Sequence, residues 1–128
     1  MIGGAHVLIY AEDAPAARAF LRDVLGWQNV DDGDGWLIFA LPPAELGVHP
    51  AEPETSGTHQ LFLMCRDIEQ TTADLEAKGV QFTSEISDAG FGLITRFKIP
   101  GGGEIGLYQP KHASPLMEFD ARTASDRD

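Results

Sequence analysis

The chain has 128 residues, a length that suits one domain with a substantial buried core. Its 20 acidic residues outnumber nine basic ones, and the net charge of −11 repels phosphate backbones and anionic bilayers. With no apolar run near the ~20 residues of a membrane span and no leader-like amino end, we expect no nucleic acid or membrane partner, although a cationic ligand is permitted.

The first half of the chain predicts a strand, a helix and further strands. Residues 7–11 form a short aliphatic and aromatic run that is typical of a buried strand. Asp13 can cap a helix that ends at Gly26, with apolar residues at helical spacing between them. After a turn-rich cluster, residues 36–41 and 45–49 are predicted as strands.

The second half repeats this order. Residues 51–58 are polar and rich in breakers, which predicts a linker. A strand at 61–65 and a helix from Asp67 to Gly79 follow, and later strands are predicted at 91–99 and 104–109.

Two further features lie in this half. The single cysteine, Cys65, lies in an apolar run, so a buried thiol and a reducing, cytoplasmic location are expected. The tail 111–128 has no periodicity; Leu116, Met117 and Phe119 can pack on the domain, and its last residues are expected to be disordered.

The two halves are related by an internal repeat. The segment His6–Asp13 returns as Gln60–Asp67 with its apolar positions in register. Likewise Glu45–His49 and Glu104–Tyr108 share the pattern Glu, aliphatic, Gly, aliphatic, ring. The repeat predicts one domain, residues 1–110, built from similar units at about 4–50 and 59–110, with a site between them.

A strand-helix-strand-strand-strand unit used twice, with His6 in the first strand and Asp13 seven residues later, resembles the vicinal oxygen chelate superfamily. That superfamily includes glyoxalase I, extradiol dioxygenases, fosfomycin-resistance enzymes and bleomycin-resistance proteins. The resemblance implies an α+β fold of two βαβββ units, whose paired curved mixed sheets enclose a cavity. It also implies a homodimer.

In metal-dependent members of this superfamily, each unit supplies one ligand from its first strand and one, usually Glu, from its last. The resemblance and the repeat place these positions at His6, Gly47, Gln60 and Gly106. One imidazole and one amide are too few for a divalent cation, because catalytic metal sites use about three strong protein ligands. No cofactor is therefore expected.

Two alternatives stay open from the residues themselves. Side chains two apart on a strand share a face, so Glu45 and His49 flank Gly47 and Glu104 flanks Gly106; with His6 they can form a rearranged divalent metal site. A slip of one residue in the register would instead turn His59 inward.

Two functions follow from these alternatives. The first is a metal-independent binding module for a small, partly aromatic molecule, which the acidic composition permits to be cationic. The alternative is a metal-dependent glyoxalase-like lyase or extradiol-type dioxygenase that uses His6, His49 and either Glu45 or Glu104. The residues alone leave open whether the chain is an enzyme.

His112 is expected to lie at the surface. The candidate cavity residues are His6, Gly47, His49, Gln60, Phe91, Gly106 and Tyr108.

Overall fold

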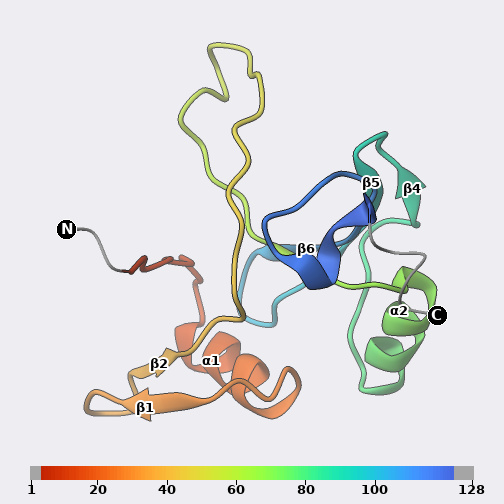
Figure 1. Ribbon diagram of the computed structural model, residues 1–128. Helices are drawn as coiled ribbons and strands as arrows, with labels where there is room; N and C mark the ends of the chain where they lie inside the picture. The colour runs from red at the N-terminus through yellow and green to blue at the C-terminus, as the bar shows by residue number, and fades with distance from the viewer. Residues whose placement is uncertain (1–3, 123–128) are drawn as a thin grey trace. The chain divides into compact units, whose positions relative to one another are not determined.

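The computed structural model describes residues 4–122, which form two compact units (Figure 1). The first unit comprises the described residues up to Ala40 together with Ile99–Gly103, and the second comprises Leu41–Lys98 and the described residues from Glu104 onward. The elements in chain order are α1 (Ala14–Asp23), β1 (Asn29–Asp31), β2 (Leu37–Phe39), β3 (Phe62–Met64), α2 (Ile68–Ala77), β4 (Ser87–Asp88), β5 (Gly92–Lys98), β6 (Glu104–Pro110) and the short 3-10 helix η1 (Met117–Phe119). Two helices with mixed strand pairing confirm the predicted α+β class.

The first unit is built on α1 and the antiparallel hairpin of β1 and β2. The carboxylate of Asp13 accepts a hydrogen bond from the Ala16 amide at 3.1 Å, which caps the helix as its sequence predicts. Ala17, Phe20 and Leu21 form its buried face. The helical signals in this segment were therefore sufficient to locate α1.

A glycine-rich loop closes the first unit against the start of α1. The Asp13 amide donates to the Gly101 carbonyl at 2.9 Å. A β-carbon at Gly101 would overlap the Asp13 carbonyl, and one at Gly102 would lie 3.2 Å from the Glu12 amide nitrogen. Both glycines also have positive φ angles of 95° and 139°. Side chains are excluded here because two stretches of backbone lie in direct contact.

The second unit holds a four-stranded sheet in the order β3-β6-β5-β4. β3 runs parallel to β6, and the other two pairings are antiparallel. Phe97, Ile105 and Leu107, all at most 3% exposed, form much of its core. The helix α2 begins after Asp67, whose carboxylate accepts from the Gln70 amide at 3.1 Å. These elements confirm the strands and helix predicted in this half.

Two predicted strands are not formed among the described residues. Residues 7–11 and 45–49 have no strand pairing, and both segments carry exposed apolar side chains. Leu8 is 61% exposed, and Leu46 and Val48 are 91% and 92% exposed. The physical reason is that an apolar run supplies side chains for a strand, whereas a strand also needs a neighbour for its backbone hydrogen bonds.

The tail folds back on the second unit as far as residue 122. Ser114 and Asp120 are each 5% exposed, and the Ala121 amide donates to the His112 carbonyl at 3.1 Å. The Arg122 guanidinium bonds to Asp120 and lowers the pKa of that carboxyl to about 2. Leu116 and Phe119 are half-buried, as packing requires, and Met117 is 77% exposed. The last residues, for which disorder was predicted, lie outside the described residues.

Candidate functional site

Five aromatic rings form a connected cluster in the second unit, which we call the ring cluster: His49, Phe62, Phe91, Tyr108 and His112. Tyr108 is central, with ring centroids 5.7 Å from Phe62, 6.0 Å from Phe91 and 6.0 Å from His112. His49 joins through Phe91 at 6.4 Å. Most of these pairs meet edge to face, the arrangement that the charge distribution of aromatic rings favours.

The sheet register explains why these rings meet. Tyr108 on β6 lies opposite Met64 on β3 and Ile94 on β5, so its neighbours come from both adjacent strands. Phe91 directly precedes β5, and His112 follows the end of β6 by two residues. The register and the ends of β5 and β6 thus bring rings from three parts of the sheet together.

Gly106 makes room for one of these rings. Gly106 on β6 is the register partner of Phe62 on β3. A β-carbon at Gly106 would overlap the Phe62 ring, lying 2.8 Å from Cγ and closer still to Cδ1 and Cε1. The space that this glycine leaves is therefore filled by an aromatic side chain of the protein itself.

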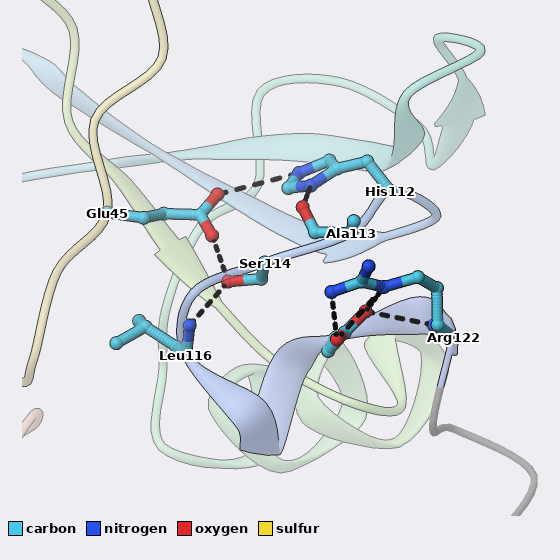
Figure 2. Close-up of polar contacts among 7 residues, drawn as sticks. Glu45, His112, Ala113, Ser114, Leu116 and Arg122 are labelled. Atoms are coloured by element: carbon cyan, nitrogen blue, oxygen red, sulfur yellow. Dashed lines mark hydrogen bonds and ion pairs between the residues drawn. The ribbon is translucent and has the colours of Figure 1, made fainter.

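A polar group around Glu45 adjoins the ring cluster at Tyr108. Figure 2 shows Glu45 in this group, with His112 and Ser114 on either side of its carboxylate. The Tyr108 hydroxyl donates to Oε2 of Glu45 at 2.7 Å, and the Ser114 hydroxyl donates to Oε1. Ser114 in turn accepts from the Leu116 amide at 3.0 Å, which fixes its position in the tail. Glu45 thus ties the segment 41–50 both to β6 and to the tail.

Burial and the Glu45 carboxylate both raise the pKa of the Tyr108 hydroxyl, burial being the larger cause. Burial disfavours the charged phenolate. The carboxylate acts in the same direction, because the neutral phenol can donate to it, whereas a phenolate would face a second negative charge. Tyr108 is therefore a hydrogen-bond donor at neutral pH and is unsuited to act as a base.

His112 lies on the other side of the same carboxylate. Its Nδ1 is 2.7 Å from the Ala113 carbonyl, which can only accept, so Nδ1 carries a hydrogen. Its Nε2 lies 3.5 Å from Oε2 of Glu45 and 3.4 Å from the Tyr108 hydroxyl. The imidazole thus lies beside both oxygens of the Tyr108–Glu45 hydrogen bond.

The predicted cavity residues divide into two sets. The structure brings His49, Phe91 and Tyr108 together, with Gly106 beside them through Phe62. The others are not part of this group. His6 is an exposed residue of the first unit, while Gly47 and Gln60 are exposed residues of the second. Gly47 has no atom within 4 Å of where its β-carbon would stand. His59, the alternative to Gln60, is exposed too.

The donor set does not fit the metal of the superfamily's metal-dependent members. Gly47 and Gly106 have no side-chain donor, and at Gly106 the Phe62 ring occupies the direction in which a carboxylate would project. In the rearranged set, Glu104 accepts from the Thr83 hydroxyl at 2.5 Å, and Glu45 is held by Tyr108 and Ser114. Within residues 4–122, no three His, Cys, Asp or Glu side chains are grouped so as to hold a metal ion.

Sequence reasoning missed three members of the site. Phe62 falls within a predicted strand and carries no signal that separates it from core residues. His112, expected at the surface, is half-buried, and Ser114 is buried in a tail without periodicity. No local signal could have found Ser114, since its partner Glu45 is 69 residues away in the chain.

The described residues have an α+β fold, and the second unit carries a polar group beside five clustered rings. The model of the Glyoxalase/Bleomycin resistance protein/Dioxygenase superfamily matches residues 4–107. The chain belongs to that superfamily, as the resemblance to the vicinal oxygen chelate proteins implied. A comparison with curated proteins finds no match.

Solved structures of the same fold support this membership. TnmS3, described as an antibiotic binding protein from Streptomyces sp. CB03234, is 25% identical with a TM-score of 0.58, covering 86% of this chain and 99% of its own. A glyoxalase/bleomycin resistance protein from the same organism is 26% identical with a TM-score of 0.52, covering 77% and 93%. A lactoylglutathione lyase from Agrobacterium tumefaciens, 19% identical over 78% of this chain and 87% of its own, shares the fold at a TM-score of 0.52.

One finding bears on the membrane. Among the described residues, neither helix is long and apolar enough to cross a bilayer.

Proposed function

We propose that this protein binds a small molecule with a flat aromatic part at the ring cluster, as an antibiotic-sequestering protein does, and without a metal at the superfamily's ligand positions. The observation that carries the proposal is the ring cluster itself, which joins Phe62, Phe91 and Tyr108 to two histidines. The lack of a fitting metal donor set and the likeness to an antibiotic binding protein support it. We further propose a cytoplasmic location.

A ring at the edge of the cluster gives the sharpest test. Phe91 is 40% exposed, so Phe91→Ala removes a stacking surface with little loss of buried core. An aromatic pair contributes about 0.5–1.5 kcal/mol beyond its burial, so the dissociation constant should rise about 2- to 12-fold. The matched control is Trp36→Ala, which removes a ring 58% exposed in the first unit.

The measurement is calorimetric titration with a panel of antibiotics that contain fused or linked aromatic rings, bleomycin among them. Saturable binding that weakens in Phe91→Ala and is unchanged in Trp36→Ala supports the proposal. The proposal is refuted if no member of the panel binds, or if both variants bind as tightly as the parent protein.

We also propose that the protein is a homodimer in which two copies exchange strands. By the internal repeat, Leu8 corresponds to Phe62 and Gly47 to Gly106, and the latter two are partners in the parallel pairing of β3 with β6. The equivalent pairing in the first half would join residues 7–11 to 45–49. Both segments are unpaired and expose apolar side chains, so a second copy can supply the missing neighbour.

A cysteine cross-link tests the exchange. In a Cys65→Ala background, the pair Leu8→Cys and Gly47→Cys should form a disulfide between chains, seen as a dimer on a non-reducing gel. Sedimentation should give a dimer for the parent protein and a monomer at equal concentration for Val48→Asp. A disulfide formed only within single chains, or a monomeric parent protein, would refute the exchange.

A further inference from the structure

We infer that Glu45 receives a positively charged group of the bound molecule, a protonated amine or a quaternary ammonium, and that this group displaces the His112 side chain from beside the carboxylate. The inference rests on the proposed function and extends it, because it names the charge of the ligand and the residue that selects it. The polar group around Glu45 in Figure 2 carries the argument.

Glu45 is a shielded carboxylate. Its side chain is 15% exposed, and its two direct hydrogen bonds come from the neutral hydroxyls of Tyr108 and Ser114. Among the described residues, its one basic neighbour is His112, at 3.5 Å. Removing a carboxylate from water is costly unless a cation or several donors compensate it. A cation that arrives here is therefore bound more strongly than at an exposed carboxylate.

The carboxylate has room for a further donor. An ionised carboxylate offers about four acceptor positions on its two oxygens. Oε1 accepts from Ser114 and Oε2 from Tyr108, so acceptor positions stay open on both oxygens. A protonated amine can donate to one of them, and a quaternary nitrogen, which has no N–H, can lie against the carboxylate by charge alone. Neither displaces the two hydroxyls, so the hydrogen bonds that hold the segment 41–50 stay intact.

The ring cluster also attracts a cation. The Tyr108 hydroxyl is hydrogen-bonded to Glu45. The ring centroids of Phe62 and Phe91 lie within 6.0 Å of the Tyr108 ring centroid. Ring faces attract cations by about 0.5–2 kcal/mol each, and Arg96 already lies over the outer ring, Phe62, at 5.4 Å. A carboxylate beside rings is a combination that favours an organic cation over a small hydrated ion.

His112 occupies the place beside Glu45 that the incoming group would take. Its Nε2 lies 3.5 Å from Oε2 of Glu45 and 3.4 Å from the Tyr108 hydroxyl. Its side chain is 34% exposed, so it can turn away at small cost in buried surface. An incoming ammonium group can then lie against the carboxylate in its place.

The test compares two probes of nearly one shape and different charge, N-methylacridinium and neutral acridine, by fluorescence titration at pH 8. The parent protein should bind the cation about 10-fold more tightly. Glu45→Gln should bring the ratio of the two dissociation constants to about one, with acridine binding unchanged. The matched control, Glu118→Gln, removes an exposed carboxylate from the tail and should leave the ratio as it is.

A second variant tests the role of His112. His112→Lys places a permanent ammonium beside Glu45, so the preference for N-methylacridinium over acridine should fall about 10-fold. Because the loss of the imidazole ring acts on both probes, the ratio of the two dissociation constants reports the added charge. In the double variant with Glu45→Gln, the added lysine should not change this ratio further, because its effect acts through the carboxylate.

The outcomes separate this inference from the proposed function. Equal affinity for both probes in the parent protein, or an equal loss for both in Glu45→Gln, would overturn the role of Glu45 and leave the proposed function standing. Failure of both probes to bind the parent protein would count against the proposed function itself. Because each variant is judged by a ratio of two ligands, a partial loss of folded protein does not alter the result.

Discussion

Replacing Gly106 by alanine tests whether this glycine exists to admit the Phe62 ring. The added β-carbon would overlap that ring, with Cγ 2.8 Å away and two further ring atoms closer. Gly106 is buried in the middle of β6, where the backbone is held by strands on both sides. The ring must therefore move, and Phe62 loses its place against Tyr108 and Arg96.

The magnitude follows from three terms. Forcing an extra carbon into a packed site costs about 1–3 kcal/mol. The lost contact with the Tyr108 ring adds about 0.5–1.5 kcal/mol. In the other direction, alanine lowers the entropy of the unfolded chain relative to glycine and stabilises by about 0.4–1 kcal/mol. The free energy of unfolding should fall by about 2 kcal/mol.

Urea denaturation followed by circular dichroism measures this change. With a slope of about 1.5 kcal/mol per molar urea, the midpoint should fall by about 1–1.5 M. The matched control is Gly4→Ala, the same substitution at an exposed glycine, where no atom lies within 4 Å of the new carbon. That variant should change the free energy of unfolding by less than about 0.5 kcal/mol.

A double-mutant cycle with Phe62→Ala identifies the cause. Without the ring there is no overlap, so Gly106→Ala should be neutral or slightly stabilising in that background, a coupling of about 2 kcal/mol. If Gly106→Ala costs the same with and without the Phe62 ring, or costs nothing in the parent protein, the reasoning fails.

Two more predictions concern single side chains in the second unit. Thr72 has a buried hydroxyl without a hydrogen-bond partner within the described part of the chain, so Thr72→Val should raise the free energy of unfolding in urea by about 1 kcal/mol. The control, Thr71→Val, loses a hydrogen bond to the Cys65 thiol and should lower it. A Thr72→Val variant of equal or lower stability than the parent protein would contradict this prediction. Burial raises the pKa of Cys65 to about 11, so the folded thiol should react slowly with a disulfide reagent at pH 8. Because the unfolded thiol ionises first, stability present below about pH 9 should be lost as the pH rises toward 11, and Cys65→Ala should remove that component; equal pH profiles for the two proteins would refute it.

The sequence was most informative where the signals are local. Asp13 and Asp67 both cap helices as predicted, because a cap depends only on the residue and the next few amides. The glycines that end both helices, Gly26 and Gly79, have the positive φ angles of 71° and 89° that such stops require. The repeat and these caps led to the correct superfamily.

Local signals could not decide which strands find a partner. Residues 61–65 and 7–11 carry the same apolar pattern, yet among the described residues only the first includes a paired strand. The apolar pattern indicates that a segment can form a strand, whereas strand pairing depends on residues that are distant in the sequence. The same limit applies to the site, where Tyr108 was predicted and its bond to Glu45, 63 residues away, was not.

The connection lengths between the strands of this sheet predict the sequence in which they pair during folding. β5 and β6 are joined by five residues and can pair early, since a short connection costs little closure entropy. β3 must then dock on the free edge of β6 across 39 intervening residues. Phe62 and Tyr108 therefore meet late, and the ring cluster is assembled in one of the last steps of folding. Until then, the edge of β6 is open to any extended chain, including that of a neighbouring molecule.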